Sequence, residues 1–154
     1  MKTKLKIAPL ALVLALLVST TPPLTQHSMA DRSTGPLVGT WRMTSLEVGT
    51  EGNLHPVPYS GQAVFTKSGT MSVQAMNPDP TAPDTPYTLN GYEAFYGTIT
   101  VDQATRTFVV TVESSLVRTL IGQRLTRVFA VKGDRLVLTP PDPAEGWRAT
   151  YERI

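Results

Sequence analysis

Residues 37–43 read LVGTWRM, and the Gly39-Thr40-Trp41 step within them begins the first strand-like stretch of the chain. From here the side chains alternate, with Trp41 and Met43 on one face and Arg42 on the other. A large aromatic residue two positions after a glycine indicates a crowded corner, which the backbone enters more easily where a side chain is missing. The stretch therefore predicts an architectural role for Trp41 in a domain built from strands.

The same period of two recurs along the chain in short segments separated by Gly, Pro, Asp and Asn, which predicts an all-β domain of antiparallel strands. We expect an eight-stranded up-and-down barrel, because closure removes the two edges that an open sheet would expose; a β-sandwich is the alternative. Residues 49–61 and the four-proline stretch 77–86 are expected to be loops, and 87–95 to include a helical turn. The expected strands lie within 40–48, 62–66, 70–76, 95–101, 107–114, 123–131, 136–139 and 147–154.

The N-terminal stretch has the features of a signal peptide. Three lysines fall within the first six residues, an apolar run follows over residues 7–18, and Ser28-Met29-Ala30 supplies small residues for cleavage. The run is shorter than the roughly 20 residues of a membrane span, and Pro22-Pro23 ends it. We predict a signal peptide over 1–30, cleavage after Ala30, a secreted or periplasmic protein, and one domain over 31–154.

Charge and cysteine content exclude several classes of function. Without the three lysines of the signal peptide, the 14 basic residues of the chain fall to 11, against 12 acidic ones. No basic field then remains to attract nucleic acid or, after cleavage, a membrane surface. Cysteine is absent, which excludes disulfides, thiolate metal sites and an N-terminal lipid anchor, and His55 is the only histidine after residue 30. We expect no metal and no cofactor.

Four segments of the chain carry a resemblance to a known family: GTWR (39–42), FTKSGTM (65–71), YEAFYGTITVD (92–102) and RVFAVKGDRLVLT (127–139). In this order they resemble the bacterial and fungal lipocalin-like domain family of calycin-type barrels. The resemblance implies that Trp41 lies at the closed end of the barrel, behind Gly39, and is covered by an arginine of the last strand. Alternation along that strand makes Arg153 the expected partner, through cation–π attraction of roughly 0.5–2 kcal/mol.

Arg127 is the leading candidate for a ligand-binding residue. It alternates with Leu125 and Phe129 in the segment LTRVFAV, so it shares the face expected to point inward. A buried guanidinium requires partners, which could be a carboxylate, phenolate or carbonyl of a ligand. The alternatives are an internal pair with Glu113, or an outward position if the strand face is shifted by one residue. The full set of expected ligand-binding residues is Arg127, Tyr96, Glu113, Phe129, Met71 and Tyr92.

Three functions are compatible with these residues. The first is binding of a small hydrophobic molecule inside an exported barrel. The second is a cofactor-independent cyclase or isomerase for polyketide- or terpenoid-like substrates, in which Arg127 polarises a carbonyl and Glu113 or a tyrosine moves a proton. The third is a protein partner, bound by a protease-inhibitor-like barrel through its N-terminal segment 31–36. Whether the protein is an enzyme stays open at this point.

Overall fold

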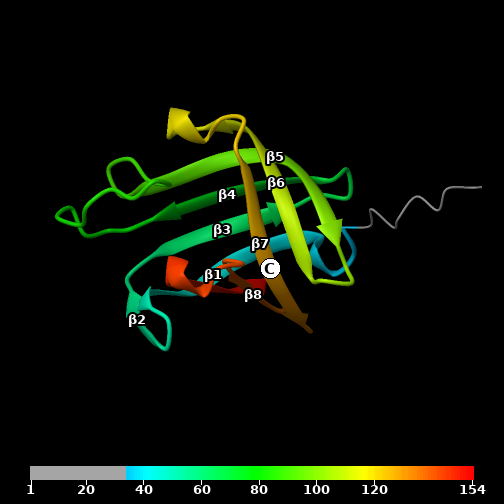
Figure 1. Ribbon diagram of the computed structural model, residues 1–154, viewed down its shortest axis with the longest axis horizontal. Coiled ribbons are helices and arrows are strands. Elements are labelled where there is room, and N and C mark those ends of the chain that lie inside the picture. Colours follow the sequence, from blue (N-terminus) through cyan, green and yellow to red (C-terminus); the bar gives the residue numbers. More distant parts are fainter. Residues whose placement is uncertain (1–33) are drawn as a thin grey trace, which may run out of the picture.

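The computed structural model describes residues 34–154 (Figure 1). The predicted signal peptide, residues 1–30, and its cleavage after Ala30 lie outside the described residues. Three short 3-10 helices, η1 (Gly35–Leu37), η2 (Arg118–Leu120) and η3 (Pro143–Glu145), accompany the strands. The strands are β1 (Gly39–Thr50), β2 (Asn53–Val57), β3 (Ser60–Phe65), β4 (Thr70–Met76), β5 (Tyr92–Asp102), β6 (Thr107–Ser115), β7 (Arg124–Lys132), β8 (Arg135–Thr139) and β9 (Trp147–Arg153).

The strands form one antiparallel sheet that closes on itself. β1 pairs with β9 in a register that runs from Trp41 opposite Arg153 to Val48 opposite Trp147. β2 pairs with the second half of β1 and β3 with the first half, so these two strands together occupy one position around the barrel. The architecture is therefore a closed eight-stranded, lipocalin-like barrel, as predicted, and the sandwich alternative is wrong.

Alternation along each strand fills the interior with apolar side chains. In β4, for example, Met71, Val73 and Ala75 are buried while Gln74 and Met76 between and beyond them are exposed. Antiparallel partners share a face, so buried Val73 meets buried Ala63 of β3 and buried Phe95 of β5. The largest fully buried side chains are Trp41, Phe65, Phe108, Leu37, Leu136, Val110 and Val112.

Two local predictions differ from the structure. The expected loop 49–61 contains β2, which forms because β1 extends beyond β3 and leaves its second half open for pairing. Pro56 lies within β2, and an edge strand tolerates it because one side needs no hydrogen-bond donor. The helical turn expected within 87–95 is also wrong, since pairing with β4 draws Tyr92 and the residues after it into β5.

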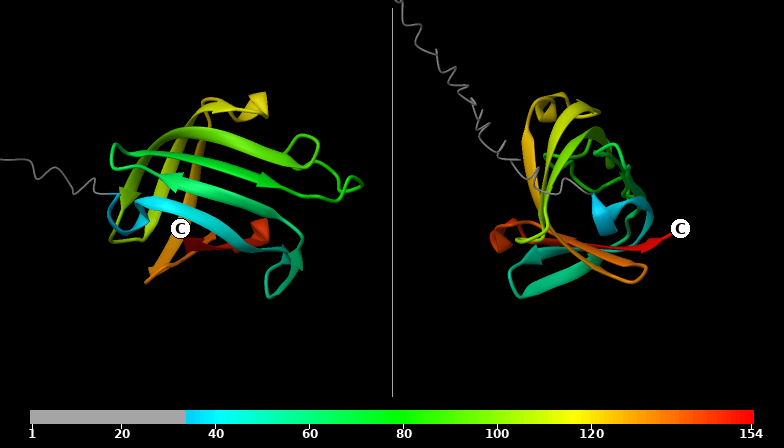
Figure 2. Two further views of the ribbon diagram at one scale, coloured as in Figure 1. Left: turned by 180° about the vertical axis from the view of Figure 1, so that it is seen from behind. Right: turned by 90° about the vertical axis from the view of Figure 1, so that its right-hand side faces the viewer.

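The barrel has two different ends. The end that we call closed holds η1 and the tight turns between β3 and β4, β5 and β6, and β7 and β8; it lies at the right in Figure 1. The end that we call open holds β2, the long segment 77–91, η2 and η3. Figure 2 shows the same arrangement from behind and from one side, with η1 lying at the closed end of the barrel.

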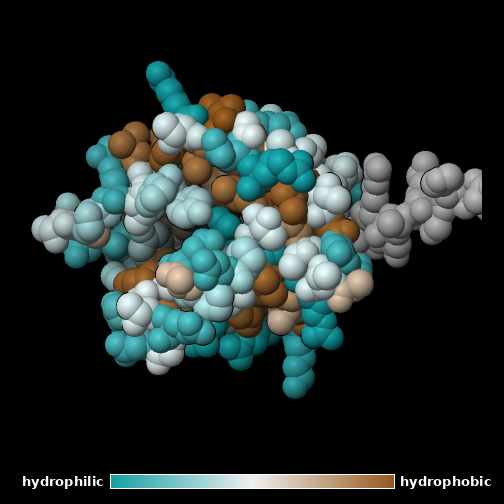
Figure 3. All heavy atoms as spheres, viewed as in Figure 1, coloured by the Kyte–Doolittle hydropathy of each residue, from teal (hydrophilic) through white to brown (hydrophobic). Residues whose placement is uncertain are grey.

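The outer surface has mixed polarity. In Figure 3 apolar side chains are interspersed with polar ones over the face shown. Between residues 34 and 154 no helix is both long and apolar enough to cross a membrane.

Candidate functional site

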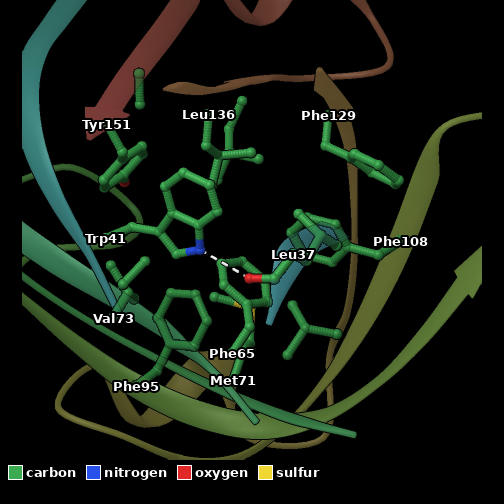
Figure 4. Close-up of a cluster of buried hydrophobic side chains, with 14 of the residues drawn as sticks. Leu37, Trp41, Phe65, Met71, Val73, Phe95, Phe108, Phe129, Leu136 and Tyr151 are labelled. Carbon is green, nitrogen blue, oxygen red and sulfur yellow. Dashed lines mark hydrogen bonds between the residues drawn. The ribbon is translucent and has the colours of Figure 1, made fainter. Parts of the chain in front are cut away.

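Trp41 fills the closed end of the barrel. Its side chain is fully buried, and its indole N–H donates a hydrogen bond of 2.7 Å to the carbonyl oxygen of Leu37 in η1 (Figure 4). Arg153 covers the ring from the last strand, with its guanidinium carbon 4.0 Å from the ring centroid. The same guanidinium donates hydrogen bonds to the carbonyl oxygens of Val38 and Pro36. The polar groups of this end are thus paired with one another, which makes it a structural plug.

Gly39 permits the close approach of Arg153. Its φ is +143°, a value that L-residues with side chains rarely adopt. A Cβ atom placed on Gly39 would overlap with Nη1 of Arg153. The glycine of the LVGTWRM stretch is therefore required by both the backbone and the arginine above it.

Arg127 extends from β7 into the open half of the barrel. Its guanidinium carbon lies 5.0 Å from the ring centroid of Trp147 in β9 and 5.4 Å from that of Tyr87 in the segment 77–91. Its Nη1 donates a hydrogen bond of 2.8 Å to the carbonyl oxygen of Thr126. A guanidinium carries five N–H donors, and its remaining donors have no hydrogen-bond acceptor among residues 34–154. Arg127 is held in place by two rings and keeps donors free.

Glu93 approaches Arg127 from β5. It pairs with buried Ala75 of β4, so its side chain points inward. Burial raises the pKa of the Glu93 carboxyl to about 7, while the positive charge of Arg127 acts in the opposite direction. In the described part of the chain no ion pair within 4.0 Å and no hydrogen bond joins Glu93 to another group. The charge of Arg127 therefore acts on the Glu93 carboxyl from beyond ion-pair distance, and a gap separates the two side chains.

Two tyrosine hydroxyls complete this polar cluster. Burial raises the pKa of Tyr151 in β9, the charge of Glu93 raises it further, and Arg127 lowers it. Burial also raises the pKa of Tyr59, which precedes β3, and Glu93 again adds to the effect. The cluster thus draws side chains from β5, β7 and β9 and from the residue that precedes β3.

The inward-facing side chains of the open half are less completely buried than those of the closed half. Inward-facing side chains around Arg127 keep part of their surface accessible, whereas those around Trp41 do not. Among the described residues no fully enclosed side-chain nitrogen or oxygen lacks a hydrogen-bond partner. The unpartnered oxygens of Glu93 and donors of Arg127 must therefore reach a space that admits water. We call this space the chamber; Arg127, Glu93 and the two rings beside Arg127, those of Tyr87 and Trp147, border it.

Comparison with known proteins adds distant structural likenesses. No family model matches the chain, and no curated protein has a matching sequence. An uncharacterized protein from Bacteroides eggerthii DSM 20697 has a similar solved structure, with 17% identity and a TM-score of 0.47 over 77% of this chain and 99% of that one. A mutant of the fluorescent protein UnaG has 13% identity and a TM-score of 0.41 over 77% and 96%. Membership of the lipocalin-like domain family thus stays a prediction, and the barrel rests on the strand pairings above.

The structure divides the six expected ligand-binding residues into three groups. Arg127 lines the chamber, as the alternation of β7 predicts. Met71 and Phe129 point inward but are buried in the core beside Trp41 (Figure 4). The other three, Tyr92, Tyr96 and Glu113, do not line the chamber.

The outward positions of these three residues follow from the strand faces. Tyr96 is 46% exposed and Glu113 is also exposed, because each directly neighbours an inward-facing residue, Gly97 and Val112 respectively. An internal Arg127–Glu113 pair is therefore wrong. Tyr92 lines a shallow hollow of about 300 Å³ on the outer surface. A Cβ atom on Gly97 would overlap with the backbone of β6, and the register between β5 and β6 shifts here at a bulge.

Sequence reasoning missed Glu93, the carboxylate that faces Arg127. Its alternation with Phe95 and Gly97 carries the signal, but assigning a helical turn to 87–95 removed that alternation from consideration. Trp147 was missed as a neighbour of Arg127 for a different reason. Its contact with Arg127 depends on how the start of β9 lies relative to β7 across the open end, which no local pattern records.

Proposed function

We propose that this barrel binds a small, largely apolar molecule in the chamber at its open end. The observation that carries the proposal is the state of Arg127, which two aromatic rings hold in place while most of its donors remain unused. Because these donors face a space that admits water, a ligand that accepts hydrogen bonds can replace that water and keep the guanidinium partnered. Apart from Glu93, the side chains that border the chamber beside Arg127 are the aromatic rings of Tyr87 and Trp147, and apolar surroundings with few polar contacts are usual for a ligand site.

The rim of the open end supports entry by an apolar molecule. Among the exposed large apolar side chains, Met76, Leu89, Leu116 and Ile121 all belong to segments at this end. The chamber and its rim thus provide an apolar path to one fixed cation. The expected export of the protein belongs to the same proposal, and N-terminal sequencing of the exported product should begin at Asp31.

The two tryptophans allow binding to be located as well as detected. N-phenyl-1-naphthylamine is a neutral apolar fluorophore that accepts excitation energy from tryptophan. In a Trp41→Phe variant, saturable energy transfer from Trp147 is expected as the fluorophore fills the chamber. In the matched Trp147→Phe variant the remaining donor is Trp41 behind the packed core, so transfer should be weaker. Absence of saturable binding to either variant and to the unmodified protein would contradict the proposal.

Glu93 favours a second candidate function, a proton-transfer enzyme acting on a carbonyl compound. A carboxyl whose pKa lies near 7 is suited to act as a general base. Glu93 would take a proton from the carbon next to a carbonyl, Arg127 would stabilise the enolate oxygen, and the proton would return to carbon. Deuterium incorporation into 2-tetralone in D2O, followed by NMR, tests this. Exchange equal in the Glu93→Gln variant and the unmodified protein would exclude it.

A further inference from the structure

The gap between Arg127 and Glu93 has a defined chemical polarity. Arg127 offers N–H donors from β7, and Glu93 offers carboxylate oxygens from β5. In residues 34–154 neither group is satisfied by the other, since no ion pair within 4.0 Å joins them. A ligand in the gap therefore meets a donor on one wall and an acceptor on the other.

The charges of the two walls balance when both groups are ionised. A ligand carboxylate would then place two negative charges against one guanidinium, and like charges at close range oppose binding. An uncharged group adds no such repulsion. It can also satisfy both walls at once if it carries an acceptor and a donor on neighbouring atoms.

We infer that the chamber selects uncharged ligands in which a carbonyl oxygen lies beside an N–H or O–H group, as in a primary amide or the enol of a β-dicarbonyl compound. The carbonyl oxygen accepts from Arg127 and the N–H or O–H donates to Glu93. Tyr87 and Trp147, which flank Arg127, contact the apolar body of the ligand. This inference rests on the proposed function, since it concerns the same chamber.

Protonation of Glu93 should weaken the selection. The charged group that acts on Glu93 is Arg127 from β7, and the charge of Glu93 in turn raises the pKa values of Tyr151 from β9 and of Tyr59 before β3. The tyrosines have raised pKa values and stay neutral, so Glu93 is the member of the cluster whose charge changes near neutral pH. Once Glu93 is neutral, a carboxylate ligand can approach the Arg127 guanidinium without repulsion from the charge of Glu93.

A matched pair of probes tests the inference on the unmodified protein. Calorimetric titration at about pH 8.5, where Glu93 is ionised, compares 2-naphthamide with 2-naphthoate, which have the same ring system and differ in the polar group. We expect the amide to bind at least about tenfold more tightly. At about pH 5.5 the affinity for the carboxylate should rise while that for the amide stays nearly constant.

The Glu93→Gln variant provides the same test without a change of pH. It keeps the shape of the side chain and removes its charge, so the preference for the amide at about pH 8.5 should disappear, mainly through tighter binding of the carboxylate. Arg127→Met should weaken both probes. If the unmodified protein binds 2-naphthoate as tightly as 2-naphthamide, or if Glu93→Gln keeps the preference for the amide, the inference is overturned. The proposal that the chamber binds a small apolar molecule is then unaffected. If neither probe binds, both the chamber and the inference fail.

Discussion

Two arginines distinguish the closed end of the barrel from its open end. Arg153 and Arg127 both point inward from strands, and both lie over aromatic rings, at 4.0 Å from Trp41 and at 5.0 Å from Trp147. Arg153 donates to two backbone carbonyls from a packed corner, whereas Arg127 has one such bond and borders open space. The same residue type over the same kind of ring thus occurs in two different surroundings. What distinguishes them is whether the remaining donors already have partners.

The largest expected difference concerns the two tryptophans. Trp41→Ala should lower the free energy of unfolding by about 3–5 kcal/mol, because it removes a fully buried ring and the hydrogen bond to Leu37. Trp147→Ala should cost clearly less, since that ring is half-buried beside the chamber. Urea unfolding of both variants measures the difference. Equal losses would show that the open end is packed as tightly as the closed end.

The arginines themselves give the next largest contrast. Arg153→Met should lower the free energy of unfolding by about 2 kcal/mol, because the carbonyls of Val38 and Pro36 lose their donor in a crowded corner. Arg127→Met should change it by about 0.5 kcal/mol or less, since only the Thr126 carbonyl loses a partner. Denaturant midpoints compared at constant slope test this pair. A greater loss for Arg127→Met would make Arg127 a structural residue and remove the main support for the chamber.

Much of the closed end could be predicted from sequence, and much of the chamber could not. Trp41, Gly39 and Arg153 belong to strands whose alternation is regular, so the face of each follows from neighbours along the chain. Glu93 is the second residue of β5, which directly follows a segment rich in turn-forming residues, and non-local pairing with β4 decides the structure there. The outward position of Glu113 follows from its neighbour Val112. Whether a residue near a bulge or a strand end faces inward or outward depends on the pairing register. That register is set by two strands together, so the sequence of one strand does not predict it.

The pH dependence of stability should reveal the chamber carboxyl. The folded protein raises the pKa of Glu93 to about 7 from its ordinary value near 4.5, so folding favours the protonated form. Its contribution to stability is complete below about pH 4.5 and is lost as the pH rises through about 7. Because water reaches the carboxyl, we expect a loss of about 1–2 kcal/mol over this interval.

Glu93→Gln should remove that loss, and Glu113→Gln, which takes a carboxylate from the outer surface, should leave it in place. Thermal unfolding of the three proteins at a series of pH values separates them. If the thermal stability of Glu93→Gln still falls as the pH rises, the titration belongs to another group and Glu93 is in full contact with solvent.

The smallest effect isolates the crowding at the closed end from backbone strain alone. Gly39 and Gly122 both have positive φ values, +143° and +84°, but a Cβ at Gly39 overlaps with Arg153 whereas one at Gly122 meets open space. Both Gly→Ala changes carry the strain of an unfavourable backbone conformation, about 1 kcal/mol. Gly39→Ala should cost more than Gly122→Ala, and the excess should shrink in an Arg153→Met background, where the obstructing guanidinium is gone. If the two glycines respond alike in both backgrounds, the close approach of Arg153 does not explain why the strand begins with glycine.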